Sequence, residues 1–360
     1  MTSFLKNTQM NFMKREDEFY RNFKISLNNY KNFFQSDHWL FNNKKKIKLF
    51  ISKNLKEFRK NGLSYGLDDQ FYNKKETNKL FNILREQYGK KALNALLEKK
   101  NIGNPKSFVK KDNFFFTGNE LVHIKHLLDF RDNISLPKKN IVCEIGSGYG
   151  SLISKIIKTY KSKVILIDLP ESNFLSHYYL KMIFPKKKFF VSSQIKNRLT
   201  KEQIINNDII ILCPWDKIPK IKIDFFINSR SMMEMTYETI RHYFNLIKGN
   251  LKIGGYFLCI NRYYKDTVGY PIELIKYPFG NNWQVLISKK SWLQDHIHYF
   301  FLKKSKNSLK DIHNEMEKIN IFSIEVKKKD QFFLRRILPT LIYKIYKVSK
   351  YRVLKYFNGI

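Results

Sequence analysis

The stretch IVCEIGSGYG, from Ile141 to Gly150, decides the fold of this chain. Its first five residues are apolar apart from Glu144 and predict a buried strand, while a helical pattern begins at Ser151. Glycine is scarce, at 14 of 360 residues, yet three glycines alternate between this strand and this helix. Because glycines admit a ligand close to the backbone and leave amides exposed at a helix start, the stretch predicts a ligand-binding loop.

A second apolar run ends at Asp168, at the distance where a carboxylate can accept hydrogen bonds from ribose hydroxyls. The two features together predict a cofactor that contains adenosine. A dinucleotide fingerprint needs its third glycine where Ser151 stands, whereas this chain places it one residue earlier, at Gly150. Glu144 would also repel a pyrophosphate, but it suits a cofactor with a positively charged amino group and a sulfonium. The pattern therefore favours S-adenosylmethionine over NAD or a flavin.

Short apolar runs alternate with helical patterns from residue 140 onward, which predicts parallel strands connected by helices. The strands are predicted at 141–145, 164–168, 209–213, 225–228 and 256–261, and the helices at 151–160, 172–183 and 237–250. Two further strands, at 283–288 and 297–302, are predicted to form a terminal antiparallel pair. The predicted fold class is α/β, with a Rossmann-like, mostly parallel sheet preceded by a mainly helical N-terminal region.

Three regions are predicted. Residues 1–135 form the mainly helical region, a lid or an oligomerisation element, in which 79–100 has the leucine spacing of one helix and 119–131 that of another. Residues 136–303 form the cofactor-binding domain, and 304–360 form a basic C-terminal extension. The three cysteines, Cys143, Cys213 and Cys259, lie inside apolar runs and are predicted to be reduced core residues of a cytoplasmic protein.

The chain carries 67 Lys and Arg against 31 Asp and Glu, a net charge of +36. Its preference for Lys, Asn, Ile, Phe and Tyr is typical of an A/T-rich coding sequence, so the charge alone does not indicate nucleic acid as a partner. Residues 331–360 contain seven basic and no acidic residues. This tail is either docked on the protein or frayed, or it contacts an anionic membrane peripherally, and these alternatives stay open. No uncharged apolar run approaches the roughly 18 residues of a membrane span.

The glycine loop, with Glu144 before it and Asp168 after it, resembles the class I S-adenosylmethionine-dependent methyltransferases. The segment LKIGGYF at 251–257 is similar to that family's turn into its fifth strand, with Ile253 where proline is common. A narrower resemblance is to the bacterial sugar O-methyltransferases. It rests on IDLPE at 167–171, YYL at 178–180 and DFFINSRSMMEM at 224–235, and it covers about 136–303.

The resemblance implies a role for each matching residue. The residues that would wrap the methionine part of the cofactor are Gly146, Ser147, Gly148 and Gly150. Glu144 would order its amino group, Asp168 would hold the ribose, and Leu169 would pack on the adenine. Trp215 would cover the adenine ring and Asp216 would accept from its exocyclic amine. Asn228, at the end of the fourth strand, would face the transferred methyl group.

A sugar hydroxyl needs a general base or a metal to react at neutral pH. The candidate bases are Glu234 and His177, which follow the fourth and second strands at the sheet edge where ligands bind. Candidate residues for binding an anionic or carbohydrate acceptor are Arg230, Arg262 and Tyr263. His296 and His298 alternate on a predicted strand and are interpreted as structural. No metal-ligand constellation is evident in the sequence.

The sequence thus predicts a cytoplasmic O-methyltransferase that acts on a sugar hydroxyl, with a nucleotide-linked or glycan-bound sugar as the acceptor. An RNA methyltransferase is the second hypothesis. Its support is almost entirely the positive net charge, because no RNA-binding module is recognised in the sequence. A non-catalytic, basic scaffold protein is the third. Retention of Glu144, the glycines and Asp168 argues against the scaffold, which has no need of them.

Overall fold

The computed structural model describes residues 18–29, 36, 39, 43, 54–61, 63–64, 72–266, 268–291, 293–307 and 311–337, with side chains of the last helix to 328. Most of the predicted basic tail, residues 338–360, lies outside the described residues. The same holds for much of the predicted N-terminal region, including residues 1–17.

An eight-stranded sheet forms the centre of the structure, in the order β11-β12-β8-β7-β3-β4-β6-β5. The strands β7, β3, β4, β6 and β5 run parallel with one another and with β8, while β12 and β11 are antiparallel additions at one end. The strand bounds are β3 Ile141–Ile145, β4 Lys163–Ile167, β5 Phe189–Val191, β6 Ile209–Leu212, β7 Ile223–Ser229, β8 Leu251–Arg262, β11 Trp283–Lys290 and β12 Ile297–Lys304. The Rossmann-like fold class with a terminal antiparallel pair, as predicted, is confirmed.

Helices cover both faces of this sheet, because successive side chains of each strand point to opposite faces. Val164 and Leu166 of β4 enter one core together with α6 (Gly118–Arg131), α7 (Ser151–Tyr160) and α8 (Pro170–Ile183). Ile165 and Ile167 enter a second core with α9 (Lys201–Asn206) and α10 (Tyr237–Asn250). All three cysteines are free and buried, as predicted.

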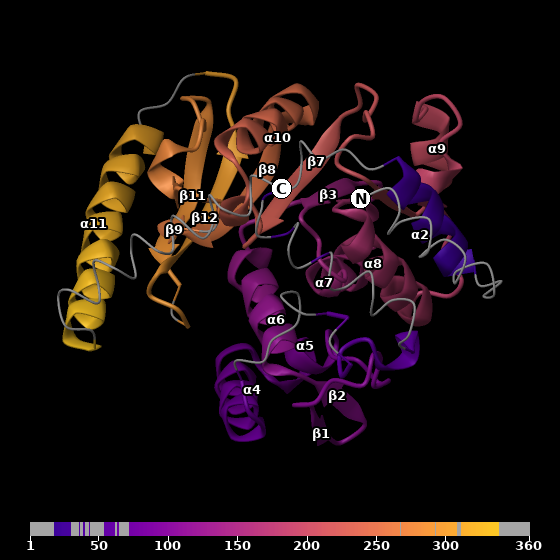
Figure 1. Cartoon of the computed structure of the whole chain (residues 1–360), viewed down its shortest axis with the longest axis horizontal. Coiled ribbons are helices and arrows are strands. Elements are labelled where there is room, and N and C mark those ends of the chain that lie inside the picture. The colour runs from indigo at the N-terminus through magenta and orange to yellow at the C-terminus, as the bar shows by residue number, and fades with distance from the viewer. Residues whose placement is uncertain are drawn as a thin grey trace, which may run out of the picture.

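The N-terminal region packs against the sheet through α6, whose Phe130 contacts Phe225 and Phe301. Figure 1 shows α6 between the sheet and a group made of α4, α5 and the β1–β2 hairpin. The bounds are α4 Lys74–Tyr88, α5 Lys90–Asn94, β1 Val109–Lys111 and β2 Phe114–Phe116. A separate helix, α2 (Glu18–Asn28), packs on α8 through Tyr20, Phe23 and Phe174.

Several local predictions were wrong. The helix expected over 79–100 is broken at Gly89, whose φ of 82° ends α4, and residues beyond α5 form turns. The β1–β2 hairpin and the edge strand β5 are too short to produce a clear period-two pattern. The fifth strand begins at Leu251, not at 256, because β8 continues through Gly254 and Gly255 with a register shift against β7.

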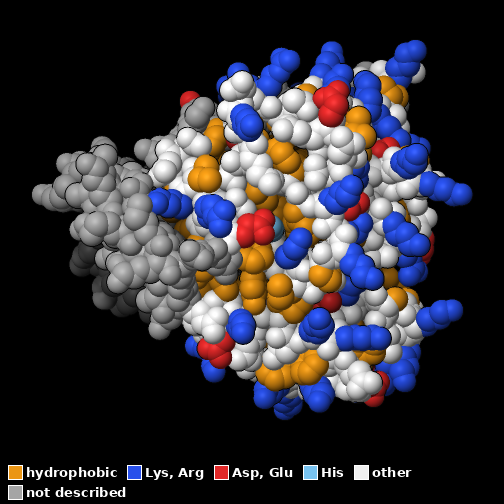
Figure 2. All heavy atoms as spheres, turned by 90° about the vertical axis from the view of Figure 1, so that its right-hand side faces the viewer, with side chains coloured by type: hydrophobic (Ala, Val, Ile, Leu, Met, Phe, Trp, Pro, Cys, Tyr) orange, Lys and Arg blue, Asp and Glu red, His pale blue; other side chains and the backbone are white. Residues whose placement is uncertain are grey.

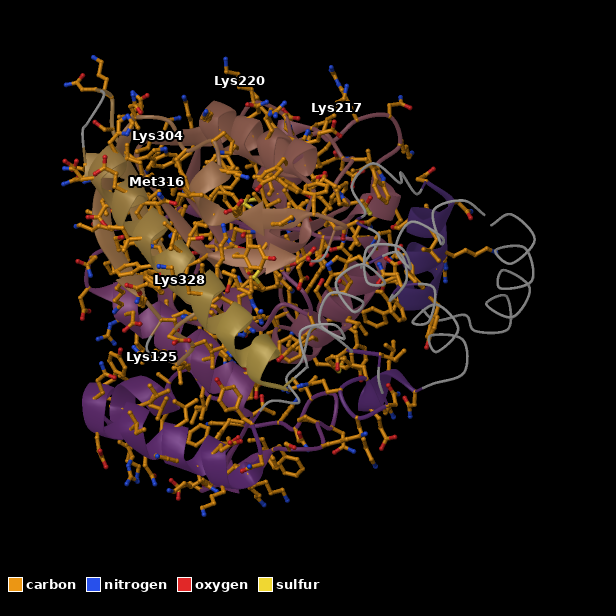
Figure 3. All side chains as sticks on the ribbon, turned by 60° about the vertical axis from the view of Figure 1, so that its left-hand side comes forward. Lys125, Lys217, Lys220, Lys304, Met316 and Lys328 are labelled. Atoms are coloured by element: carbon orange, nitrogen blue, oxygen red, sulfur yellow. The ribbon has the colours of Figure 1, made fainter. Side chains whose placement is uncertain are left out.

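The last described helix, α11 (Asp311–Ile337), packs beside the antiparallel strands (Figure 1). Figure 3 shows it crossing the molecule from Met316 toward Lys328. Its residues 331–337 carry the start of the predicted basic tail as helix. Among the described helices, none combines the length and apolar character that crossing a membrane requires.

Small additional strands and 3₁₀ turns complete the architecture. The strands β9 (Tyr264–Asp266) and β10 (Pro271–Glu273) pair with each other after β8. The turns are η2 Leu55–Glu57, η3 Ser192–Gln194, η4 Met232–Glu234 and η5 Leu274–Lys276. The turn η4 and the strand β9 lie next to each other and bring their side chains to the carboxyl edge of the parallel strands.

Candidate functional site

A cavity of about 280 Å³ opens at the carboxyl edge of β3, β4, β7 and β8. One half of its wall, which we call the cofactor half, consists of Glu144, the glycine loop, Asp168 and Leu169. The other half, the acceptor half, consists of side chains that follow β7 and β8, together with residues from α6 and the N-terminal region. The structure therefore brings the first predicted motif and two of the three predicted acceptor residues, Arg230 and Arg262, to one site.

The glycine loop lies directly against the backbone of neighbouring segments. Gly146 has a φ of 71°, and its N–H donates to the carbonyl of Ile167 at 2.8 Å. A Cβ at Gly146 would lie only 2.0 Å from Ser231 Oγ, so no side chain fits there. Gly148 and Gly150 also have positive φ, at 58° and 87°, and Gly150 is the residue at which α7 begins. The glycines are thus required by the backbone path as well as by ligand access.

Glu144 is a buried carboxyl group at the end of β3. Its Oε2 has no hydrogen-bond partner among the described residues, and the same is true of Ser147 Oγ and Ser151 Oγ beside it. Burial raises the pKa of Glu144 well above its ordinary value, and the nearby charge of Asp168 adds to this effect. A ligand with a positively charged nitrogen would supply both the missing hydrogen bond and the missing counter-charge.

Asp168 connects the end of β4 to the glycine loop. Its Oδ2 accepts from the N–H of Gly148 at 2.7 Å, and its Oδ1 accepts from the N–H of Leu169 at 2.7 Å. Each carboxylate oxygen can accept further hydrogen bonds. Asp168 lines the cavity, as does Leu169, so the structure places both residues at the candidate site.

The turn after β6 contributes less than predicted. Pro214 lines the cavity, but Trp215 and Asp216 are not among its lining residues. Asp216 Oδ2 accepts from the N–H of Cys213 at 2.7 Å, and the N–H of Asp216 donates to the carbonyl of Cys213. Asp216 therefore closes its own turn, and the structure does not bring it or Trp215 to the cavity wall.

Asn228 does not face the cavity, contrary to the prediction that it faces the transferred group. It is fully buried, and its Nδ2 donates to the carbonyl of Ile145 at 2.9 Å and to Ser231 Oγ at 2.6 Å. Its Oδ1 accepts from Asn261 Nδ2 at 2.8 Å. These bonds occupy the amide in joining β3, β7 and β8, so Asn228 holds the loop of Ser231 in place.

Glu234 lies in the acceptor half, in η4, as predicted for a candidate base. Its carboxylate forms an ion pair with Lys265 of β9, and its Oε2 accepts from Trp39 Nε1 at 3.0 Å. Burial lowers the pKa of Lys265, an effect that the attraction of Glu234 opposes. Arg230 and Arg262 line the same half of the cavity.

His177 and Tyr263 are not at the cavity. The imidazole of His177 is buried between Phe19 of α2 and Phe189 of β5, with ring centroids 4.6 and 5.4 Å away. Burial lowers its pKa to about 4. Tyr263 is fully buried, and its hydroxyl lies 2.9 Å from Nδ1 of His298. His298 is thus structural, as interpreted, whereas His296 precedes β12 and does not share the strand face expected for it.

Sequence reasoning assigned no role to several residues that line the cavity. Met233 and Met235 flank Glu234, whereas the others lie further away along the chain: Ser36, Trp39, Asn119, His123 and Lys265. The helix that carries His123 was predicted, but nothing in its pattern showed that the partly exposed ring would face this site. Its Nδ1 is buried without a hydrogen-bond partner, and burial, with the charges of His126 and Arg230, lowers its pKa well below the ordinary value. Among the described residues, no three His, Cys, Asp or Glu side chains gather as metal ligands.

Comparison with known proteins found no matching protein family profile and no matching curated protein. Among solved structures, mitomycin 7-O-methyltransferase is 11% identical over 52% of this chain and 57% of its own length, with a TM-score of 0.34. Geranyl diphosphate C-methyltransferase from Streptomyces coelicolor, solved with S-adenosyl-L-homocysteine, is 12% identical over 52% and 82%, with a TM-score of 0.36.

Human N-acetylserotonin methyltransferase, solved with S-adenosylmethionine, is 13% identical over 64% of this chain and 60% of its own length, with a TM-score of 0.33. The chain thus spans about three fifths of the length of this protein and of the mitomycin enzyme. Similarity this weak carries no argument about the chemistry of the chain. Strand order and register, which come from the chain itself, define the fold.

Proposed function

We propose that this protein is an S-adenosylmethionine-dependent O-methyltransferase that acts on a sugar hydroxyl. The observation that carries the proposal is the unpartnered, buried carboxyl oxygen of Glu144, which lies beside the glycine loop in the same cavity as Asp168. A sheet edge with this arrangement fits a cofactor that has both an ammonium group and a ribose. The neighbouring acceptor half would then bind the molecule to be methylated.

The residues that would hold the cofactor are Glu144, Gly146, Ser147, Gly148, Asp168 and Leu169. Glu144 would pair with its ammonium group, and the hydroxyls of Ser147 and Ser151 offer further hydrogen bonds. Asp168 would accept from the ribose hydroxyls with the lone pairs that Gly148 and Leu169 leave available. The bound cofactor supplies an electrophilic methyl group.

Methyl transfer to a hydroxyl requires alignment of the two reacting atoms and removal of one proton. We assign proton removal to Glu234, which lies in the acceptor half and is oriented by Lys265 and Trp39. Lys265 and Trp39 hold this carboxylate in place, and an acceptor hydroxyl would displace one of these two donors. His177, buried under α2, takes no part in the reaction.

The sugar assignment rests on the resemblance of residues 167–171, 178–180 and 224–235 to sugar O-methyltransferases. The positive charge alone does not favour RNA in its place, because Figure 2 shows Lys and Arg side chains scattered over the described part of the face in view, among apolar and acidic side chains. Lys217 and Lys220, labelled in Figure 3, belong to the loop between β6 and β7 and are not among the residues that line the cavity.

The test uses the full chain and S-adenosylmethionine labelled in its methyl group. The protein is incubated with a panel of nucleotide sugars and with polysaccharide fragments, and products are identified by mass spectrometry. We expect a mass increase of one methyl group on a sugar. A chain that binds S-adenosylmethionine but methylates RNA instead would reject the sugar assignment, and a chain stabilised by NAD but not by S-adenosylmethionine would reject the whole proposal.

A further inference from the structure

The imidazole of His123 is a polar group at the cavity that the reaction described above does not use. His123 lies in the middle of α6, where residues 118–122 and 124–128 are all buried. In this stretch only His123 is partly exposed, and it lines the cavity. His123 therefore belongs to the wall of the candidate site and not to the core around α6.

The neighbouring ionisable side chains of α6 have partners inside the protein, in contrast to His123. The carboxylate of Glu120 accepts from the N–H of Thr117 at 2.9 Å, and Lys125 Nζ donates to Asp129 at 2.6 Å. The Nδ1 atom of His123 is buried without a hydrogen-bond partner among the described residues. Buried polar atoms are nearly always hydrogen-bonded, so an exception at a cavity wall calls for a functional explanation.

His298 of β12 shows how this chain holds a structural histidine. Its Nδ1 lies 2.9 Å from the hydroxyl of Tyr263, and its Nε2 lies 3.0 Å from the hydroxyl of Ser288, so the protein satisfies both ring nitrogens. At His123, no bond to Nδ1 fixes which nitrogen carries the proton. Nε2, the ring nitrogen farther from the helix backbone, can then either donate a hydrogen bond or accept one.

The surroundings of His123 keep its imidazole neutral. Burial lowers its pKa well below the ordinary value, and the charges of His126 and Arg230 act in the same direction. A low pKa makes the ring a weak base, so proton removal stays with Glu234. A neutral ring can still bond to an uncharged hydroxyl, and it does not repel the sulfonium of the cofactor proposed for the same cavity.

We propose that His123 is an acceptor-binding residue, whose Nε2 forms a hydrogen bond with a second oxygen atom of the acceptor while the hydroxyl to be methylated lies next to Glu234. The two side chains come from separate elements, α6 and η4, and line one cavity. Two such contacts restrict rotation of the acceptor, so that one particular hydroxyl meets the methyl group. This inference rests on the proposed function and narrows it, because alcohols with a single oxygen are excluded as preferred acceptors.

The experiment compares two amide variants of the full chain. The side-chain amide of His123→Asn ends near the position of Nδ1, whereas that of His123→Gln extends to the position of Nε2. Turnover is measured with labelled S-adenosylmethionine and UDP-glucose, UDP-galactose, GDP-mannose or dTDP-rhamnose. The sugar that the wild type methylates fastest is then used to determine kcat and KM. Calorimetry measures the affinity for S-adenosylhomocysteine.

We expect the KM for the sugar to rise about tenfold in His123→Asn, because one hydrogen bond is lost, and to stay within threefold of the wild type in His123→Gln. The affinity for S-adenosylhomocysteine should be unchanged in both variants. The matched control is His242→Asn, which alters an exposed histidine of α10 outside the cavity and should leave kcat and KM unchanged.

Three results would overturn the inference. The first is that both variants have the kcat and KM of the wild type. The second is that kcat falls in both while KM does not change, which is the pattern of a base. The third is a loss of S-adenosylhomocysteine binding in both, which is the pattern of a structural residue. If the wild type methylates none of the sugars, the proposed function fails and the inference fails with it.

Deoxy analogues of the methylated sugar that keep the reactive hydroxyl identify the second oxygen. One analogue should raise the KM of the wild type about tenfold but have little further effect in His123→Asn, because both changes remove the same hydrogen bond. If every analogue changes KM by the same factor in the wild type and in the variant, His123 contacts none of these oxygens and the inference is wrong.

Discussion

The two halves of the cavity are built in different ways. The cofactor half comes from one continuous strand–loop–helix–strand unit, from Glu144 to Leu169, and relies on backbone amides and two carboxyl groups. The acceptor half collects side chains from residues as far apart as Trp39, His123 and Lys265. A cofactor of fixed chemistry can be held by a local motif, whereas an acceptor site is assembled by the tertiary fold.

Because the two halves are separate, substitutions can test cofactor binding and turnover separately. Changes in the cofactor half should alter affinity for S-adenosylmethionine, and changes in the acceptor half should alter turnover while the cofactor still binds. A variant whose effect on affinity or on turnover appears in the wrong half of the cavity contradicts this division.

The largest effect is expected for Glu234→Gln. Removing a general base typically lowers a rate by about 10²- to 10⁴-fold, which corresponds to roughly 3 to 5 kcal/mol. The amide still accepts a hydrogen bond from Trp39, so we expect cofactor affinity to change little. Turnover is measured with labelled S-adenosylmethionine and affinity by calorimetry. Glu238→Gln, an exposed carboxylate at the start of α10, is the matched control. Turnover within threefold of the wild type would remove Glu234 from its assigned role.

Asp168→Ala tests the cofactor half. A ligand at about 100 times its Kd stabilises a fold by roughly 2.7 kcal/mol, seen as a rise of a few degrees in Tm. We expect this variant to lose most of that rise relative to its own unliganded Tm, because the ribose loses its acceptor. Asp216→Ala is the comparison, since Asp216 closes a turn outside the cavity wall. If Asp216→Ala loses the rise and Asp168→Ala keeps it, the adenosine part lies elsewhere than proposed.

The residues of the cofactor half could be predicted from the sequence because they lie close together along the chain. Glu144, the glycines and Asp168 lie on or next to two adjacent strands, and short continuous apolar runs locate those strands. The acceptor half was only partly predictable. Arg230, Glu234 and Arg262 follow or end recognisable strands, but His123 on α6 and Trp39 from the N-terminal region reach the cavity through tertiary contacts that no local pattern encodes.

Two residues that were predicted to face the site, Asn228 and Tyr263, are instead buried away from the cavity. Asn228 and Tyr263 end or follow strands at the expected edge, yet their polar atoms bond to Ser231, Asn261 and His298 inside the protein. Sequence position gives the edge but not the direction in which a side chain points. The break at Gly89 was missed for a related reason, since leucine spacing continues through a residue whose φ cannot continue a helix.

Glu144→Gln should affect stability as well as binding. A carboxyl group whose pKa is raised by folding stabilises the protein below the ordinary pKa of glutamate, and that contribution is lost as pH rises toward the raised value. The amide avoids this loss, so above pH 4.5 the free energy of unfolding of the unliganded variant should exceed that of the wild type, by roughly 1 to 3 kcal/mol. The variant should bind S-adenosylmethionine poorly because it cannot pair with the ammonium group.

Denaturant titrations at several pH values between 5 and 8 check this prediction, and calorimetry checks the loss of binding. Glu202→Gln, an exposed carboxylate in the first turn of α9, is the control and should show neither effect. Tight cofactor binding by Glu144→Gln would mean that this carboxyl group does not face the ammonium. The cofactor half would then need a different ligand.

The smallest effect on turnover is expected for His177→Asn. The imidazole lies among Phe19, Phe189 and the rest of the contact between α2 and α8, outside both halves of the cavity. Burial lowers its pKa to about 4, so the folded protein keeps it neutral while the unfolded chain takes up a proton near pH 6.5. Its contribution to stability is therefore present above pH 6.5 and is lost as pH falls toward 4. We expect turnover within threefold of the wild type at pH 7.5 and a weaker loss of stability on acidification, measured by denaturant titration.

His123→Asn is the comparison at the cavity wall and should reduce turnover more than His177→Asn does. If His177→Asn were instead the more damaging of the two, with cofactor affinity retained, the acceptor half would have to include the surface of α8 under α2.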